Sequence, residues 1–429
     1  MTFNRRHFMS LLPVAVSQQR VFASGDTGLL QRQTAASFPA LRQQVAGRPL
    51  AYLDSAATTL RPQAVIDALA EFYATDNANP APVHTLARRA AARLAAARQT
   101  VARFINAPSP GEVIFTRGTT EGINLIASTW GAASIRPGDE VILTIAEHNS
   151  NLLPWTRAAT LAGATVRVVD VDEEGRLRLD QLKQMISAKT RLIAFSHVSN
   201  VLGLVNPAKD ICALARLAGA RVIIDGAQSV PHVNVDVQDL GCDFYVFSGH
   251  KMLGPMATGV VWGRLELLDA MPAYHVGSNM AHEVDFDHAS MEHGAQKFQA
   301  GTPDVAGPVG LAAAIEFLTA LGKDAAWRHD QDLVRHGLAR LREVKGLRVI
   351  GPTSLADRVP VFTFTIDGKS PVVIANALDA RGIAIRAGDM AALPLLRRFG
   401  VSEAARVSAY VYSTTHDIDR LVQALAEIA

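Results

Sequence analysis

The chain has 429 residues, of which 49% are hydrophobic and 19% charged. That length suggests two or three domains at the usual ~150 residues each. The 42 basic and 40 acidic side chains leave a formal net charge of +2, so the charge balance indicates no nucleic-acid or membrane-surface partner. Only Cys212 and Cys242 are present, too few for a disulfide framework. Both lie in apolar surroundings and are expected to be buried, inert thiols.

The N-terminus carries two consecutive arginines, Arg5 and Arg6, followed by an apolar run at residues 11–16. This pattern predicts a twin-arginine signal peptide over residues 1–23, with cleavage after Ala23. The alternative is a cytosolic tail that contains two adjacent arginines. The apolar run is too short to span a bilayer, and no later run predicts a transmembrane helix. We therefore expect export of the folded protein by the twin-arginine machinery and a periplasmic location.

Short apolar segments alternate with helical patterns through the first two thirds of the chain. Pro62 suits a first helical turn, and the Ala- and Arg-rich run over 85–105 predicts a long helix. This alternation favours a mostly parallel sheet with helices on both faces. The predicted strands are 113–116, 140–145, 166–171, 191–196, 221–225, 243–247 and 259–262.

The pattern changes after an apolar helix predicted over 307–321. Strands at 347–350, 361–365 and 383–385 and a helix at 372–380 predict a smaller α+β domain. We therefore expect an N-terminal segment with a large domain over 24–318, and a small C-terminal domain over 319–429.

Two apolar strands end in residues that suit one cofactor. Asp225 follows Val222-Ile223-Ile224, and Lys251 closes the sequence Ser248-Gly249-His250-Lys251. A lysine amine condenses with the aldehyde of pyridoxal 5'-phosphate (PLP), and a carboxylate keeps the pyridine nitrogen protonated, so that the ring accepts electrons. Both residues lie just past strand ends, where open α/β sheets bind ligands. A surface lysine and a solvated acid are the alternatives, and the apolar neighbours disfavour them.

A phosphate site is predicted at Gly118-Thr119-Thr120, which follows a strand and opens a helix. A helix N-terminus offers unpaired N–H groups and the positive end of the helix dipole. An ordinary N-cap at Thr119 is the alternative. Ser248 and His250 can reach the same phosphate. Gln228, three residues after Asp225, can donate a hydrogen bond to the phenolic oxygen of PLP.

These segments resemble the cysteine desulfurase and selenocysteine lyase group of the class V aminotransferase superfamily. The resemblance extends from Ala51-Tyr52-Leu53-Asp54-Ser55 to Arg406-Val407-Ser408, most of the chain after the N-terminus. It implies the PLP fold type I, with a large mostly parallel-sheet domain, a small α+β C-terminal domain, and a homodimer whose site lies near the interface.

The resemblance also implies roles for individual residues. His148 would stack on the pyridine ring and move protons, as an imidazole can near neutral pH. Thr302 would reach the phosphate across the dimer interface. A guanidinium can pair bidentately with a substrate α-carboxylate, which is the role implied for Arg406. The other residues that match substrate-site positions are Arg386, Asn200 and His84. No metal site is indicated.

One loop departs from the family pattern. The most similar branch carries Arg-x-Gly-x-x-Cys, whereas this chain has Arg386-Ala387-Gly388-Asp389-Met390-Ala391. Ala391 stands where that branch has its sulfur-accepting cysteine, and a desulfurase needs a thiolate there to carry sulfur away as a persulfide. Asp389 adds a negative charge that would repel an acidic side chain and attract a basic one. It could be a general acid, a substrate anchor or a solvated loop residue.

We therefore predict a periplasmic, homodimeric PLP enzyme that acts on an amino acid or an amino-acid-bearing metabolite. Cleavage of a C–S or C–Se bond, without a persulfide cysteine, is the favoured reaction. A class V aminotransferase or a tailoring enzyme is the first alternative, because twin-arginine-exported members of the superfamily are associated with siderophore maturation. A catalytically idle PLP-binding protein is the second alternative. The retained Lys251, Asp225, His148 and Arg406 argue against an idle protein.

Overall fold

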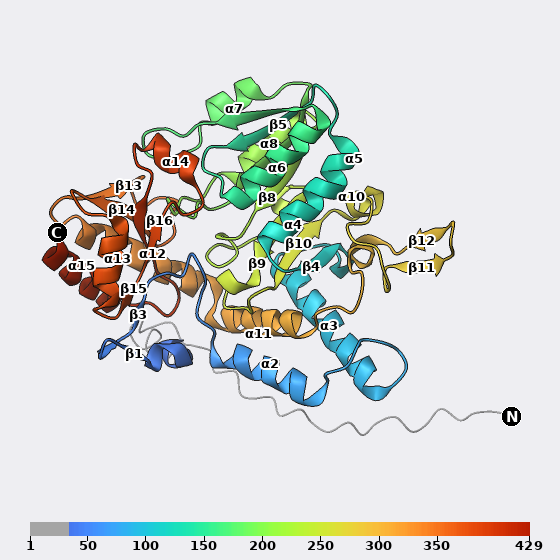
Figure 1. Ribbon diagram of the computed structural model, residues 1–429, viewed down its shortest axis with the longest axis horizontal. Coiled ribbons are helices and arrows are strands. Elements are labelled where there is room, and N and C mark those ends of the chain that lie inside the picture. The colour runs from blue at the N-terminus through green and yellow to red at the C-terminus, as the bar shows by residue number, and fades with distance from the viewer. Residues whose placement is uncertain (1–33) are drawn as a thin grey trace.

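The centre of the molecule is a seven-stranded sheet (Figure 1). The computed structural model describes residues 34–429, so the predicted signal peptide lies outside the described residues. The strand order is β4-β10-β9-β8-β7-β5-β6, and only β10 runs antiparallel to its neighbours. The predicted α/β fold with a mostly parallel sheet is thereby confirmed. The strands are β4 (Val113–Thr116), β5 (Glu140–Thr144), β6 (Thr165–Val169), β7 (Thr190–Ser196), β8 (Arg221–Asp225), β9 (Phe244–Ser248) and β10 (Gly259–Gly263).

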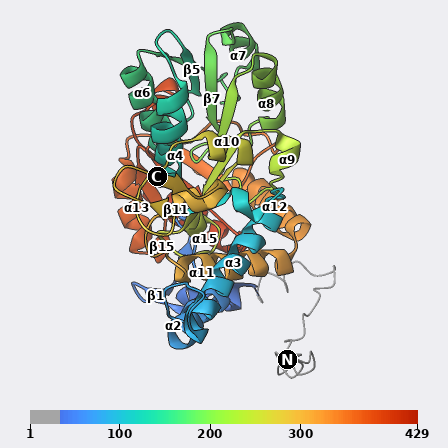
Figure 2. The ribbon, with the colours of Figure 1, turned by 90° about the vertical axis from the view of Figure 1, so that its right-hand side faces the viewer.

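Helices cover both faces of this sheet, as Figures 1 and 2 show. Neighbouring strand residues alternate between two apolar cores: Ile142 packs in one core, and Val141 and Leu143 pack in the other. Because both faces are buried, the strands are near-continuous apolar runs rather than alternating ones. One face is covered by α4 (Thr119–Ile126), α6 (Asn149–Ala162) and α10 (Leu265–Ala270), the other by α3 (Thr85–Phe104), α8 (Ala208–Leu217) and α11 (Ala306–Leu321).

The C-terminal part forms a second, smaller unit around its own apolar core. Its antiparallel sheet has the order β13-β14-β17-β16. This agrees with the α+β pattern predicted for the end of the chain. The elements are β13 (Leu347–Ile350), β14 (Val361–Ile366), β16 (Arg386–Gly388) and β17 (Ala404–Ser408), with α12 (Lys323–Leu341), α13 (Pro371–Asp379), α14 (Leu393–Arg398) and α15 (Thr415–Ile428).

An early segment belongs to this small core. Strand β3 (Ala51–Tyr52) pairs in parallel with β15 (Ile383–Ala384), and Leu53 is fully buried among the C-terminal residues. The expected division between residues 318 and 319 falls inside α11, and it assigns this early strand to the large domain. A linear division could not capture such a pairing, because the two strands are more than 300 residues apart.

The remaining elements are short connections, apart from the helix that follows Pro62. They are β1 (Gln44–Val45), β2 (Arg48–Pro49), α2 (Gln63–Thr75), α5 (Ala132–Ser134), α7 (Leu179–Met185), α9 (Val237–Leu240), β11 (Ala281–Val284) and β12 (Ala289–Met291), the π-helical turn Ala127–Gly131, and the 3-10 turns Pro39–Arg42, Pro110–Glu112, Gly249–Lys251 and Gly294–Phe298.

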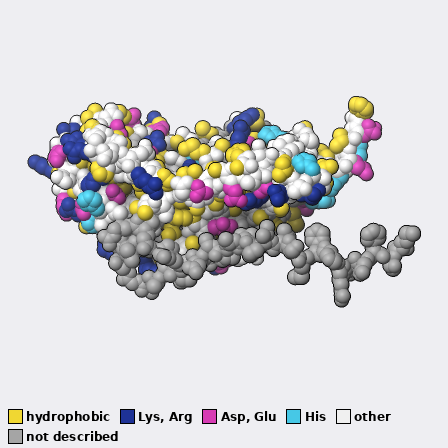
Figure 3. All heavy atoms as spheres, turned by 90° about the horizontal axis from the view of Figure 1, so that it is seen from below, with side chains coloured by type: hydrophobic (Ala, Val, Ile, Leu, Met, Phe, Trp, Pro, Cys, Tyr) yellow, Lys and Arg dark blue, Asp and Glu magenta, His cyan; other side chains and the backbone are white. Residues whose placement is uncertain are grey.

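The hairpin of β11 and β12 projects from one end of the body (Figures 1 and 3). Phe286, between the two strands, is fully exposed, and Val284 is 74% exposed. Among residues 34–429, no helix is long and apolar enough to cross a membrane. The same residues contain no group of three or more His, Cys, Asp or Glu side chains arranged to hold a metal ion.

Candidate active site

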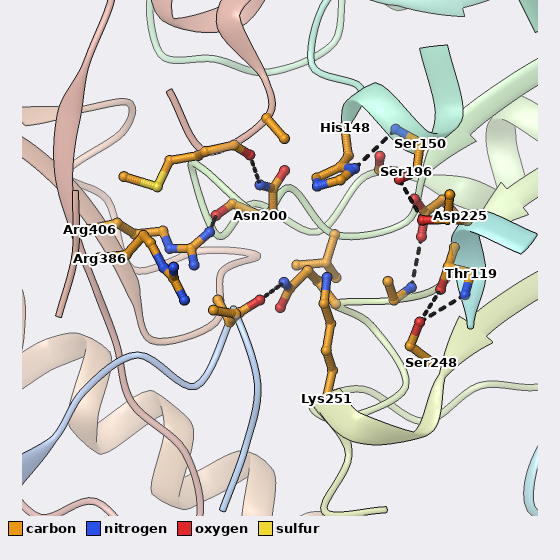
Figure 4. A pocket seen from close by; sticks show the side chains of 18 of the residues that line it. Thr119, His148, Ser150, Ser196, Asn200, Asp225, Ser248, Lys251, Arg386 and Arg406 are labelled. Carbon is orange, nitrogen blue, oxygen red and sulfur yellow. Dashed lines mark hydrogen bonds between the residues drawn. The ribbon is translucent and has the colours of Figure 1, made fainter. Parts of the chain in front are cut away.

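A cavity of about 500 Å³ lies between the central sheet and the small C-terminal unit. Its walls come from segments that are far apart in sequence, between residues 56 and 406, and Figure 4 shows their side chains converging. The cavity brings together most of the residues that the sequence singled out: Thr119, Thr120, His148, Asn200, Asp225, Gln228, Ser248, His250, Lys251, Arg386 and Arg406.

Two predicted residues do not line this cavity. His84 is exposed and caps the N-terminus of α3, where its Nδ1 accepts the Ala87 N–H at 3.3 Å. Within one chain, His84 lies outside the pocket, so its position gives no support for contact with a substrate. Thr302 is also exposed and away from the pocket lining. Its predicted role is across a dimer interface, which a single chain does not test.

Lys251 rises into the cavity from the 3-10 turn that follows β9 (Figure 4). Burial lowers the pKa of its amine to about 8, with Arg406 acting in the same direction and Asp225 opposing. Within the described residues the amine forms no hydrogen bond or ion pair. A substantial fraction of this amine is therefore neutral and nucleophilic near pH 8, as attack on an aldehyde requires.

Asp225 ends β8 and is 5% exposed. Burial raises the pKa of its carboxyl group, whereas the N–H of Ala227 and the amine of Lys251 lower it. Its Oδ1 accepts the Ala227 N–H at 2.9 Å. The carboxylate is thus held at the strand end, facing the same cavity as Lys251 (Figure 4).

One end of the cavity is lined by the start of α4 and the end of β9. The backbone N–H and the hydroxyl of Thr119 each lie 2.8 Å from the Ser248 hydroxyl. The preceding Gly118 has φ +146°, and a Cβ on Gly259 would meet the Gly118 backbone at 2.4 Å. Because neither glycine has a side chain, the start of β10 can lie directly against the segment that joins β4 to α4. The result is a cluster of N–H and O–H groups at a helix N-terminus, which suits a phosphate.

The opposite end of the cavity carries two arginines from neighbouring strands. Arg386 of β16 and Arg406 of β17 are register partners. Both pair with Asp54, at 2.7 Å from Arg386 and 3.5 Å from Arg406. Arg406 also donates to the Asn200 carbonyl at 3.0 Å, while its Nε has no partner among the described residues. This end therefore suits a carboxylate.

Burial is the main cause that lowers the pKa of Arg406, to about 10, and Asp54 opposes it. The guanidinium group therefore remains charged at neutral pH. Arg386 is more open, with 49% of its side chain exposed. The buried arginine is the better-positioned of the two for orienting a small anion.

The loop that lacks a cysteine is bonded to two other parts of the cavity wall. The Met390 carbonyl accepts the Asn200 side-chain amide at 2.9 Å, and the Ala391 carbonyl accepts the Asn149 N–H at 2.7 Å. Met390 and Ala391 have φ values of +54° and +52°. Such left-handed conformations cost energy in residues other than glycine and persist only when contacts impose them.

His148 directly precedes α6 and caps it, since its Nδ1 accepts the Ser150 N–H at 3.1 Å. Burial lowers the pKa of this imidazole to about 4, and Lys251 and Arg406 add to that effect. The ring is therefore neutral at pH 7, and because Nδ1 is an acceptor, Nε2 carries the proton. His250 has a similarly lowered pKa of about 4, mainly through burial.

Sequence reasoning overlooked Glu147, which is 1% exposed beneath the pocket wall. Four hydrogen bonds of 2.6–3.1 Å reach its carboxylate, from Thr144, Asn151 and both the backbone and hydroxyl of Ser196. Burial raises its pKa to about 7. The sequence points to Glu147 only through its position directly before His148. That position does not predict that the Glu147 side chain is buried.

Other residues of the lining were also missed. Ser150 joins the hydroxyl of Thr120 at 2.7 Å, and Ser196 lies at the end of β7. Ala56 was missed as well, and its carbonyl accepts the side-chain amide of the predicted Gln228 at 2.6 Å. Small and hydroxyl-bearing residues often follow strands. The sequence therefore gives no sign of which of them line the cavity.

The donor set fits PLP. A partnerless amine at Lys251, a buried carboxylate at Asp225 and a helix N-terminus at Thr119 face one cavity, and each corresponds to one group of the cofactor: aldehyde, pyridine nitrogen and phosphate. When bound, PLP supplies an electron sink for the bonds to a substrate α-carbon. Fold and site together define a PLP-dependent enzyme of fold type I.

Comparison with known proteins agrees with that class. The family model "Aminotransferase class-V" matches residues 51–421, and the chain belongs to this family. A cysteine desulfurase of Synechococcus elongatus is 43% identical over 95% of this chain, although the chain spans only 65% of that longer relative. A probable cysteine desulfurase of Halalkalibacterium halodurans is 44% identical over 90% of this chain and 95% of its own length.

A solved structure is similar over the whole fold. The cysteine desulfurase CsdA from Escherichia coli superposes with a TM-score of 0.86 at 37% identity, covering 92% of this chain and 98% of its own. The superposition extends across both the large sheet and the small C-terminal unit.

Proposed function

We propose that the protein cleaves the Cβ–S or Cβ–Se bond of an amino acid by β-elimination, without an enzyme thiol. The observation that carries the proposal is the pocket lining, which contains no cysteine among residues 34–429. Cys212 and Cys242 are buried in the apolar core beside the central sheet. Burial raises the pKa of Cys212 to about 12 and that of Cys242 well above its usual value. Neither thiol can accept sulfur from a bound substrate.

The groups that bind and deprotonate an amino acid are all present. Arg406, held by Asp54 and by the Asn200 carbonyl, binds the α-carboxylate. The Lys251 amine takes the proton from Cα, and the Nε2–H of the neutral His148 ring donates a hydrogen bond to the leaving sulfur.

The reaction balances without a further reactant. The Cα–H bond breaks and its proton goes to Lys251. The Cβ–S bond breaks with both electrons remaining on sulfur, which leaves as a thiolate and takes up the proton held by Lys251 to become a thiol. The three-carbon fragment takes up one water and is released as pyruvate and ammonium. No oxidant or reductant is needed, and no persulfide forms.

The test is to incubate the PLP-loaded protein with L-cysteine and with L-selenocysteine and to identify the carbon product. Pyruvate supports β-elimination. Alanine with released sulfide or selenium would mean desulfurase-type chemistry and would overturn the proposal. No product from either, with normal cofactor absorbance, would instead favour transamination or the tailoring of a larger metabolite.

We also propose that the protein acts in the periplasm as a homodimer. The motif at Arg5 and Arg6 supports export, and the exposed side chains of Val284 and Phe286 on the projecting hairpin support self-association. Replacing both arginines by lysine should retain the protein in the cytosol. In a dimer, Thr302→Ala should weaken PLP binding while leaving the size of the assembly unchanged.

A further inference from the structure

The loop from Gly388 to Ala391 is the part of the cavity that a substrate side chain meets. Its Met390 carbonyl is bonded to Asn200, whose own carbonyl is bonded to Arg406. Its Ala391 carbonyl is bonded to the residue after His148. A substrate with its carboxylate at Arg406 and its α-carbon near Lys251 therefore extends alongside this loop.

Asp389 is the one ionisable side chain of that loop. It lines the cavity and is exposed, so it lies where the cavity meets solvent. Its Oδ1 accepts the Ala391 N–H at 3.0 Å, which holds the carboxylate in a defined position. Within residues 34–429 it forms no ion pair. Its charge is felt inside the site, because it raises the pKa of His148 against the larger lowering effect of burial.

The charges of the other pocket residues are already matched. Arg386 and Arg406 share the single carboxylate of Asp54, which leaves one positive charge for the α-carboxylate of a substrate. Asp225 would pair with the pyridine nitrogen of PLP and Lys251 would join its aldehyde, so neither leaves a surplus charge. His148 and His250 are neutral at pH 7. Among the ionisable side chains that line the cavity within residues 34–429, Asp389 is the one left without a counterpart.

We propose that Asp389 binds a positively charged group at the far end of the substrate side chain, so that the substrates are S- or Se-substituted amino acids with a basic substituent. This inference rests on the function proposed above and identifies its substrate class. The cavity of about 500 Å³ has room for such a substituent beside the cofactor. An acidic substituent would instead meet the Asp389 charge and be disfavoured.

Three probes of similar size test the inference: S-(2-aminoethyl)-L-cysteine, the neutral S-propyl-L-cysteine and the acidic S-carboxymethyl-L-cysteine. Dissociation constants are measured from the change in cofactor absorbance, which reports binding without turnover. The aminoethyl probe should bind at least about fivefold more tightly than the propyl probe, and the acidic probe most weakly. The difference should shrink as ionic strength rises.

Variants assign the preference to one side chain. Asp389→Asn can keep the hydrogen bond from Ala391 and should abolish the preference, while Asp389→Lys should reverse it in favour of the acidic probe. Glu403→Gln makes the same change in charge at an exposed residue outside the pocket lining and should leave the preference intact. Equal binding of the three probes, a preference that survives Asp389→Asn, or no binding of the aminoethyl probe overturns the inference.

Product analysis separates this inference from the proposed function. β-Elimination from the aminoethyl probe consumes water and yields 2-aminoethanethiol, pyruvate and ammonium. A charge preference without pyruvate would refute the lyase and keep the role of Asp389. Pyruvate from all three probes without a preference would keep the lyase and refute the role of Asp389.

Discussion

The backbone N–H of Asn149 donates a hydrogen bond to the carbonyl oxygen of Ala391, at 2.7 Å. Asn149 is the first residue of α6, so the bond uses one of the N–H groups that a helix start leaves unpaired. It attaches the loop of the small C-terminal unit to the segment that carries His148. The left-handed backbone of Ala391 is thereby held in place, and the loop forms part of the cavity wall.

Replacing Ala391 by cysteine should add sulfur-accepting chemistry to the site. A thiol at this position lines the cavity beside the substrate side chain, so part of the product from L-cysteine should change from pyruvate to alanine. Mass spectrometry should then find a persulfide on the new cysteine. Ala387→Cys places a thiol elsewhere in the same lining and serves as the control. Equal alanine from both variants would contradict the position that we assign to Ala391.

Replacing Lys251 by alanine should abolish the absorbance of the attached cofactor. Loss of the base alone should reduce turnover roughly 10²–10⁴-fold, because no other partnerless amine faces Asp225 within the described residues. Lys209→Ala, which removes an exposed lysine paired with Asp239, is the matched control. Rescue of a deletion phenotype by the Lys251 variant would mean that catalysis is not the function.

The attachment of PLP to the protein freed of its cofactor should depend on pH through Lys251. Its pKa is lowered from 10.5 to about 8, chiefly by burial, and only the neutral amine attacks an aldehyde. The rate constant should therefore fall about tenfold per unit as pH drops well below 8, and level off above it. Asp225→Asn removes the charge that raises this pKa, so the midpoint should shift to lower pH. A midpoint near 10.5 in the unaltered protein would show that the amine is not buried.

Glu147→Gln should lower the free energy of unfolding by about 1–3 kcal/mol at low pH. The new side-chain NH₂ group of glutamine would face another donor, either the side-chain amide of Asn151 or the backbone N–H of Ser196. Asn151 cannot turn its oxygen toward this NH₂ group, because that oxygen accepts a hydrogen bond from Trp155. Glu140→Gln, at the start of the β5 strand that precedes Glu147 and paired with the partly exposed Arg167, should cost less than about 1 kcal/mol. Denaturant unfolding monitored by circular dichroism compares the two.

The effect of Glu147 should also change with pH. Its pKa in the folded protein is raised from 4.5 to about 7, mainly by burial, so the folded state holds its proton more tightly than the unfolded state does. The unaltered protein should therefore lose stability as pH rises from about 4.5 to 7. Glutamine does not titrate, and the gap between variant and unaltered protein should narrow over this range. A constant gap would contradict a raised pKa.

Local sequence was sufficient to predict pocket residues where a reactive or polar side chain directly follows a buried strand. The run of Val222 to Ile224 predicts a buried strand, and the Asp225 that ends it is indeed buried at the pocket. The same reasoning placed Lys251 and Thr119 correctly. It does not account for His84, which matches an active-site position by resemblance, caps a helix outside the pocket of its own chain, and stays a prediction.

The sequence by itself determined the alternation of strands and helices, most of the residues that meet in the cavity and the absence of a cysteine from the loop after Arg386, because these depend on residue type and short-range periodicity. Only the tertiary structure decided that Asp54 would join Arg386 to Arg406, that Asn149 would hold Ala391, and that Glu147 would be buried. Those contacts join segments tens to hundreds of residues apart. The packing of two apolar cores sets their distances, and no local pattern encodes it.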